Sequence, residues 1–184
     1  MRIVAGKFRG MQLQAPKSDD IRPTSDRVRE AVFSILGSRI GPHLEGLHVL
    51  DLFAGTGALG FEALSRGAAH CVFIDTGIEA RGLIRGHIEH FGVGGQTKLL
   101  KRDATDLGPA ERIKPSDLVF LDPPYGMGLG ERALASAVAG GWIAPEALVV
   151  LEERKDVAIE APSGTQIIDR REYAETAITF LEVA

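Results

Sequence analysis

The feature that most constrains the fold is the regular alternation of apolar, strand-like segments with helix-like segments from residue 47 onward. Five such units in succession predict a doubly wound, mostly parallel α/β sheet with helices on both faces. The expected strands are Leu47–Phe53, Cys71–Asp75, Thr97–Lys101, Leu118–Leu121 and Ala147–Glu152, and the expected helices are Ala58–Arg66, Ile78–Phe91, a short one near 106–113 and one near 130–140.

The last part of the chain has a different pattern. Two extended segments, Gln166–Arg171 and Thr176–Glu182, flank the turn residues 173–175. This arrangement predicts an antiparallel hairpin that completes one edge of the sheet.

A further helix is expected before the alternating units. Apolar residues between Val28 and Leu36 recur with helical spacing, and Thr24 or Ser25 can serve as the N-cap. We expect Gly37 and Gly41, which precedes Pro42, to end this helix.

The first 20 residues form a basic arm. Its alternating stretches, Arg2–Ala5 and Met11–Gln14, predict a small β-hairpin appended to a single domain that spans residues 1–184. Because residues 1–17 contribute +4 to a net charge of −4, the remainder of the chain carries −8. This asymmetry suggests a patch that contacts phosphates. The candidate RNA-binding residues are Arg2, Lys7 and Arg9, with Arg22 and Arg27 continuing the basic character beyond the arm.

Composition argues against several classes of protein. No apolar stretch approaches the roughly 20 residues that span a bilayer, and the amino terminus lacks the hydrophobic region of a signal peptide, so a cytoplasmic protein is expected. A single cysteine, Cys71, excludes an internal disulfide and a thiolate metal cluster. We interpret Cys71 as a packed core thiol, and His87 and His90 as a solvated helix face rather than a metal site.

The tetrapeptide Asp122-Pro123-Pro124-Tyr125 follows the apolar run Leu118–Leu121, so it emerges where a buried strand ends. The exocyclic amine of a nucleobase becomes a useful nucleophile when acceptors hold its N–H groups. Asp122 supplies one acceptor and the carbonyl of Pro123 another, while the prolines remove two backbone donors. Tyr125 offers a stacking face for a base. These four residues are therefore candidate catalytic residues, and a plain strand-end turn is the alternative.

A glycine-rich turn, DLFAGTGALG at Asp51–Gly60, leads from the first strand of the alternating units into a helix. Its spacing lets the backbone approach a ligand at a helix N-terminus. The same spacing serves dinucleotides, so a nicotinamide or flavin enzyme is the natural alternative. In a dinucleotide enzyme, Asp51 would place a carboxylate close to the negatively charged pyrophosphate. The same carboxylate suits S-adenosylmethionine, which carries an ammonium and a sulfonium. The candidate cofactor-binding residues here are Asp51, Phe53, Gly55 and Gly57.

Two further acids follow the next strands. Asp75 closes the second strand of the alternating units, Cys71–Asp75, and can accept hydrogen bonds from both hydroxyls of a ribose. Asp103 follows the third, where its side chain can accept from an adenine amino group while the amide of Ala104 donates to a ring nitrogen. With Asp51 and Asp122, these acids mark the carboxyl ends of consecutive parallel strands, the edge at which open α/β sheets bind ligands.

These motifs resemble those of a known family over nearly the whole chain. The matching segments are Arg2–Gly10, Arg22–Thr24, Arg27–Phe33, the DLFAGTGALG turn, the DPPY tetrapeptide and the closing Thr-rich strand. They are similar to those of class I S-adenosylmethionine-dependent methyltransferases, specifically the RsmD-type 16S ribosomal RNA guanine-N2 methyltransferases. The chain departs from this pattern at Thr76-Gly77, where the family often has a lysine and a polar residue, so the resemblance does not assign the rim of the adenosine site. It also departs at Tyr173-Ala174, where tyrosine-glycine is frequent.

The resemblance implies a Rossmann-like fold, S-adenosylmethionine as the cofactor, and methyl transfer to N2 of a specific guanine. It implies that Thr24 lies in a lid beside the cofactor, that the arm touches RNA, and that the DPPY tetrapeptide holds the target guanine. The implied partner is ribosomal RNA within a partly or fully assembled small subunit, bound by a monomer without metal or membrane.

The residues by themselves leave alternatives open. An adenine-N6 methyltransferase would use the same DPPY chemistry, although it would usually carry an added target-recognition region for which this chain has no room. A dinucleotide oxidoreductase leaves the DPPY tetrapeptide without a purpose. A non-catalytic RNA-binding assembly factor needs only the basic arm. The choice between guanine and adenine depends here on the resemblance.

Overall fold

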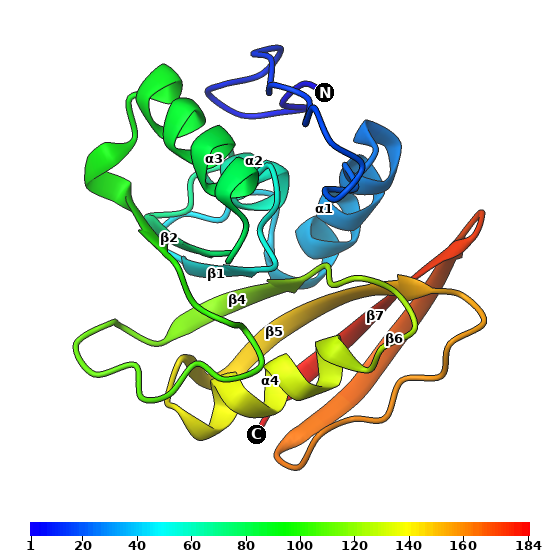
Figure 1. Cartoon of the computed structure of the whole chain (residues 1–184). Coiled ribbons are helices and arrows are strands. Elements are labelled where there is room, and N and C mark those ends of the chain that lie inside the picture. The colour runs from blue at the N-terminus through cyan, green and yellow to red at the C-terminus, as the bar shows by residue number, and fades with distance from the viewer.

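The computed structural model describes residues 1–184 and contains one seven-stranded sheet with helices on both faces (Figure 1). The strands are β1 (His48–Leu52), β2 (His70–Ile74), β3 (Thr97–Leu100), β4 (Ser116–Leu121), β5 (Ile143–Arg154), β6 (Thr165–Tyr173) and β7 (Thr176–Val183). The helices are α1 (Asp26–Ile40), α2 (Ala58–Ser65), α3 (Ile78–Phe91) and α4 (Leu129–Ala139), with a 3-10 turn at Gly94–Gln96. The predicted α/β fold is confirmed.

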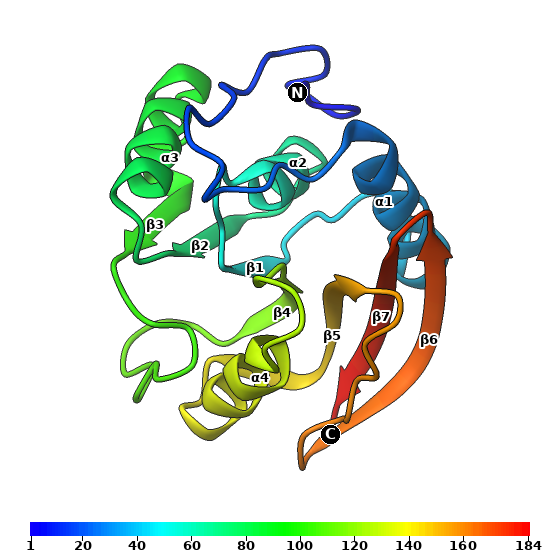
Figure 2. The same ribbon diagram turned by 45° about the vertical axis from the view of Figure 1, so that its right-hand side comes forward.

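The strands lie in the order β3-β2-β1-β4-β5-β7-β6 (Figure 2). Neighbours from β3 to β5 run parallel, and β7 runs antiparallel to both β5 and β6, which confirms the C-terminal hairpin. The chain passes from β1 outward to β2 and β3 and then returns to β4 on the other side of β1. The carboxyl ends of β1 and β4 therefore flank the point where the winding direction reverses, the usual ligand site of such sheets.

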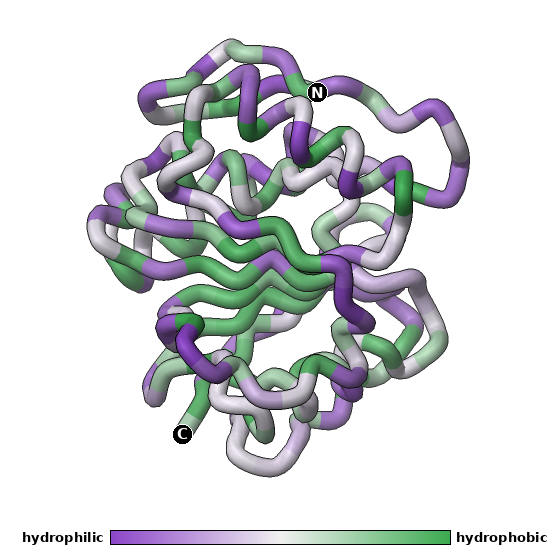
Figure 3. Tube along the Cα trace, turned by 60° about the vertical axis from the view of Figure 1, so that its left-hand side comes forward, coloured by the Kyte–Doolittle hydropathy of each residue, from purple (hydrophilic) through white to green (hydrophobic).

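Two hydrophobic cores lie on opposite faces of the sheet. The larger contains buried side chains of α1, α2 and α3, and the other contains those of α4. The central strands are apolar along most of their length (Figure 3), and their buried side chains belong to both cores because both faces are covered. Cys71 is fully buried in the larger core, as expected for a packed thiol. None of the helices has the length and apolar character needed to cross a membrane.

Helix α1 follows its predicted start but continues past its predicted end. The side chain of Ser25 accepts a hydrogen bond from the amide of Val28, so Ser25 is the N-cap. Gly37 does not end the helix, which continues to Ile40 and is capped by Gly41 with φ of 96°. One glycine inside a helix costs only about 1 kcal/mol, and buried residues on both preceding turns hold α1 in place.

The short helix expected near 106–113 is absent, and that prediction was wrong. Gly108 has φ of 70° and is followed by Pro109, which cannot donate a helical hydrogen bond. The segment bonds instead to the end of α4: the amide of Ala110 donates to the carbonyl of Gly140, and the indole of Trp142 donates to the carbonyl of Gly108. Tertiary contacts therefore replace local ones.

The interpretation of His87 as solvated was also wrong, because this side chain is buried between the arm and the glycine-rich turn. Its Nε2 accepts from the amide of Gln14 at 2.8 Å, so its Nδ1 donates to the carbonyl of Thr56 at 3.0 Å. Burial lowers the pKa of His87 from its ordinary value, which favours this neutral form.

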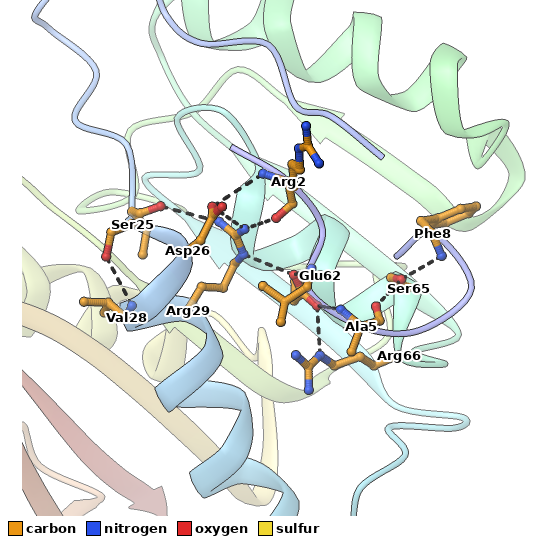
Figure 4. Close-up of polar contacts among 12 residues, drawn as sticks. Arg2, Ala5, Phe8, Ser25, Asp26, Val28, Arg29, Glu62, Ser65 and Arg66 are labelled. Carbon is orange, nitrogen blue, oxygen red and sulfur yellow. Dashed lines mark hydrogen bonds and ion pairs between the residues drawn. The ribbon is translucent and has the colours of Figure 1, made fainter. Parts of the chain in front are cut away.

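The N-terminal arm packs above α2 and α3 (Figure 1). It forms the predicted hairpin without two extended strands: Arg2 lies opposite Gln12, and the amides of Ile3 and Leu13 each donate across the hairpin at 3.0 Å. Ile3 and Leu13 are buried in the larger core, and Arg29 and Glu62 are fully buried beneath the arm (Figure 4). The arm therefore covers the outer side of α2, a helix whose residues are all buried.

Candidate functional site

A cavity of about 760 Å³ lies at the carboxyl ends of β1, β2 and β4. Among the sequence-predicted site residues it is lined by Arg22, Thr24, Asp51, Phe53, Gly55, Asp75, Asp122, Pro123 and Pro124. These come from four separate stretches of the chain, which the parallel sheet aligns at one edge. Its volume suits a nucleoside-sized ligand.

The glycine-rich turn forms one wall through an unusual backbone. Phe53, Gly55 and Gly57 have φ of 55°, 59° and 80°, and the positive φ of the non-glycine Phe53 is a strained conformation typical of ligand sites. A β-carbon at Gly57 would lie 2.6 Å from the ring of Phe61. Gly57 therefore shapes the turn as the N-cap of α2 but does not line the cavity.

Two of the predicted cofactor acids are held by backbone amides. Asp51, which is 1% exposed, accepts from the amide of Gly60 at 3.1 Å, and burial raises its pKa well above the ordinary value. Asp75 accepts from the amides of Gly55 and Gly77 at 2.9 and 2.8 Å. Each carboxyl is thus fixed in direction while it keeps acceptor capacity toward the cavity.

Asp103 and Ala104 lie outside the cavity lining. Asp103 is exposed and accepts from the amide and the hydroxyl of Thr105 at 2.9 and 2.7 Å, and these bonds lower its pKa. Ala104 is buried in the second core. The strand β3 ends at Leu100, so these two residues stand further from the sheet edge than the expected strand implied.

At the β4 end of the cavity, Asp122 is held by two side chains from the segment before α1. The guanidinium of Arg22 donates to it at 2.7 Å and the hydroxyl of Thr24 at 3.0 Å. Arg22 also donates to Glu152 at 2.8 Å, and its guanidinium lies 4.0 Å from the ring centre of Tyr125. The candidate stacking face of Tyr125 is therefore covered by a planar cation.

The electrostatics of this cluster favour a basic carboxylate. Burial, together with the neighbouring charge of Glu152, raises the pKa of Asp122 to about 7, against the opposing effects of Arg22 and Thr24. A carboxyl with such a pKa can accept a proton at neutral pH, as a general base requires. Burial also raises the pKa of Tyr125, whose hydroxyl donates to Glu152 at 2.8 Å and contacts the hydroxyl of Thr176 at 3.0 Å.

Sequence reasoning missed several parts of the site, including Ile78, Glu79 and Ala80 at the start of α3. Residues 18–21 line the cavity, and the amide and hydroxyl of Ser18 donate to Glu79 at the start of α3. Glu152 joins the Asp122 cluster from β5. The sequence pattern could have identified Glu152, because it is an acidic residue at the end of the predicted fifth strand, in the same position as Asp51 and Asp75 in theirs. The segment 18–21 carries no comparable pattern.

The other basic candidates lie away from this cluster. Arg2, Lys7, Arg9 and Arg27 are exposed and form no ion pair within the protein, unlike Arg22. The main chain of Arg2 is bonded to Asp26 and Arg29, while its guanidinium points away from them (Figure 4). These four cations remain free to meet an external anion.

Comparison with known proteins agrees with this geometry. The family described as conserved hypothetical protein 95 matches residues 1–182. Ribosomal RNA small subunit methyltransferase D of Escherichia coli K12 is 34% identical over 95% of this chain and 85% of its own length. The Haemophilus influenzae protein of the same name is 32% identical over 93% of this chain and 88% of its own length.

Solved structures give the same result. A putative methyltransferase from Escherichia coli, yhhF, superimposes with a TM-score of 0.83 at 29% identity, covering 100% of this chain and 97% of its own. The fold alone is shared with magnesium protoporphyrin IX methyltransferase of Synechocystis, solved with bound SAM, at a TM-score of 0.63 and 16% identity over 86% of this chain and 79% of its own. The chain therefore belongs to the conserved hypothetical protein 95 family and is a methyltransferase of the RsmD type.

Proposed function

We propose that the protein transfers the methyl group of S-adenosylmethionine to the exocyclic N2 of a specific guanine in small-subunit ribosomal RNA. The observation that carries this proposal is the continuity of one cavity from Asp51, Gly55 and Asp75 to Asp122 and its prolines. A donor held at the first group of residues would face an amine held at the second. The relatives named above, which are ribosomal RNA small subunit methyltransferases, support RNA as the substrate.

The residues on the β1 and β2 side fit the cofactor. The buried Asp51 suits the ammonium of the methionine part, and Asp75 has acceptor capacity left for ribose hydroxyls after its two amide bonds. Phe53 and Gly55 complete this wall, and Thr24 lines the cavity at its other end, beside Asp122. When bound, S-adenosylmethionine supplies an electrophilic methyl group.

The β4 side fits the amine. Asp122 and the carbonyl of Pro123 would accept hydrogen bonds from the two N2 hydrogens, which directs the nitrogen lone pair toward the cavity. Transfer of the methyl group to N2 would release S-adenosylhomocysteine and would leave the nitrogen with one proton to lose. Asp122, with its raised pKa, is placed to accept that proton.

The exposed cations Arg2, Lys7, Arg9 and Arg27 would contact RNA phosphates outside the cavity. We propose that the partner is ribosomal RNA in a partly or fully assembled small subunit and that the protein acts as a monomer. Because the protein carries a net charge of −4, these exposed cations rather than the whole surface would provide the attraction.

The test uses labelled S-adenosylmethionine with ribosomal RNA and with small subunits from cells that lack the protein. Label in N2-methylguanosine after nucleoside analysis is the expected result. Label in N6-methyladenosine would transfer the proposal to an adenine enzyme, and retention of RNA without any label would indicate a non-catalytic binding protein. Mapping the labelled position also identifies the target base.

A further inference from the structure

A second carboxylate stands beside Asp122 as a consequence of strand register. Leu121 of β4 pairs with Leu151 of β5, so the residues that follow them, Asp122 and Glu152, are neighbours at the same edge of the sheet. Glu152 is 6% exposed, and its Oε1 accepts from both Arg22 and Tyr125. Two carboxylates in this position would repel each other, and Arg22 relieves that repulsion.

The guanidinium of Arg22 is a planar group that lies over the ring of Tyr125 and pairs with two carboxylates. It lies 4.0 Å from the ring centre of Tyr125, and two of its nitrogens donate separately to Asp122 and Glu152 at 2.7 and 2.8 Å. Its side chain is 41% exposed, so its position borders solvent. Tyr125, Asp122 and Glu152 are thus arranged to hold a planar group that has two parallel N–H donors on one edge.

Guanine presents such an edge. Its N1–H and its N2 amine flank one ring carbon, in the same nitrogen–carbon–nitrogen arrangement as a guanidinium. We propose that Glu152 selects guanine by accepting its N1–H while Asp122 accepts from N2, with the base replacing the Arg22 guanidinium on Tyr125. This inference rests on the proposed function and adds the residue that determines the choice of base.

The same pair of acceptors disfavours adenine. With the adenine amine on Asp122, the adjacent ring nitrogen N1 carries a lone pair and no hydrogen. That lone pair would face the carboxylate of Glu152 in a buried site, where two unpaired acceptors are costly. Discrimination by such hydrogen-bond patterns is worth about 1–3 kcal/mol, or roughly 5-fold to 150-fold.

The test uses 2-aminopurine, which keeps the exocyclic amine at position 2 but has no N1–H. RNA carrying guanine or 2-aminopurine at the mapped position is prepared by ligation and assembled as the substrate requires. The ratio of kcat/KM for the two bases is measured for the wild type and for Glu152→Gln. A glutamine can accept from N1–H through its oxygen or donate to a bare N1 through its amide. The guanine preference should therefore fall by about tenfold or more in Glu152→Gln.

The matched control is Thr176→Val. It removes the other partner of the Tyr125 hydroxyl but leaves Glu152 unchanged. If Glu152 merely positioned Tyr125, both variants would alter the ratio in the same way. On our proposal Thr176→Val keeps the wild-type ratio, even if its overall rate falls. Because the intrinsic reactivity of the two bases cancels between variants, only a change in recognition moves this ratio.

The outcomes separate this inference from the proposed function. If the wild type forms N2-methylguanosine but Glu152→Gln keeps the wild-type ratio, the role of Glu152 is refuted and the proposed function stands. If the wild type forms no N2-methylguanosine, the proposed function itself fails. Both variants are first compared with the wild type by S-adenosylmethionine binding and thermal unfolding, and Glu152→Asp replaces Glu152→Gln should the latter not fold. Aspartate withdraws the acceptor by one methylene but cannot donate to a bare N1, so a smaller fall in the ratio, of about 5-fold, is expected.

Discussion

Asp122 combines burial, a second carboxylate and a neighbouring arginine in one place. Burial and Glu152 raise its pKa to about 7, while the hydrogen bonds from Arg22 and Thr24 keep it a well-directed acceptor. On the surface the same side chain would be a weak base with many orientations. The site therefore gains both basicity and direction from the fold.

Replacing Asp122 with alanine should abolish methyl transfer, lowering kcat/KM by about 100-fold or more, because the amine loses an acceptor and a base. Affinity for S-adenosylmethionine should change little, since the residues proposed to hold it remain. Turnover by radiolabel transfer and affinity by calorimetry provide the two measurements. Near-wild-type turnover in Asp122→Ala would remove Asp122 from the proposed chemistry.

The activity should depend on pH through Asp122. Because its pKa is raised to about 7, Asp122 is mostly protonated at pH 6 and mostly ionised at pH 8. We therefore expect kcat/KM to rise with pH, with a midpoint near pH 7, and to level off above about pH 8.

Arg22→Ala should move the midpoint of this profile upward, because Arg22 opposes protonation of Asp122. Arg27→Ala, which changes an exposed arginine outside the cluster, should leave the midpoint in place even if it weakens RNA binding. A midpoint unaffected by Arg22→Ala would show that another group controls the profile.

At the scale of elements, α2 depends on one buried charge network. Arg29 and Glu62 are both fully buried and bonded at 3.1 Å, and Glu62 also accepts from the amides of Val4 and Ala5 (Figure 4). The other Glu62 oxygen accepts from Arg66 at 2.9 Å. A charged residue can lie in this all-buried helix because arm, α1 and α2 together provide partners for it.

Breaking this network should destabilise the fold. Arg29→Met leaves Glu62 with less compensation inside the protein, and removal of one partner from a buried pair costs about 3–5 kcal/mol. Urea unfolding followed by circular dichroism measures the loss. Arg27→Met, on the exposed side of the same helix, should change stability by less than about 0.5 kcal/mol. Equal effects of the two substitutions would contradict the role of the network.

At the scale of the whole molecule, the arm belongs to the same core as the sheet. Ile3 and Leu13 are 2% and 3% exposed, and the amides of Lys7 and Phe8 donate to Ser65 at the end of α2. A β-carbon at Gly6 would lie 2.0 Å from the carbonyl oxygen of Ser65, so the arm and α2 are in direct backbone contact. We therefore propose that arm and body unfold together.

Leu13→Ala tests this cooperativity. Loss of a buried leucine should cost about 2–5 kcal/mol of global stability and leave a single unfolding transition. Gln12→Ala, whose side chain is exposed next to it, should have almost no effect. A separate early transition, with the main transition unchanged, would mean that the arm is an independent appendage.

Predictability from sequence differed between elements for identifiable reasons. Helix α3 was predicted to its exact bounds because its apolar face is flanked by Gly77 and Gly92. The segment 106–113 was misassigned because its backbone bonds to Gly140 and its neighbours, which lie about 30 residues away. Local sequence patterns predict hydrogen bonds within one helix or strand, but they do not predict hydrogen bonds between segments that are distant in the chain.

The sequence by itself determined the layered α/β fold, the glycine-rich turn and the strand-end positions of Asp51, Asp75 and Asp122, because these follow from hydrophobic period and backbone chemistry. Only the tertiary structure joined Arg22 to Asp122 and Glu152, across 100 and 130 residues of chain. The contact of Arg22 with both carboxylates depends on the order and register of β4 and β5, which local sequence patterns do not predict. The choice of base, on our proposal, depends on this register.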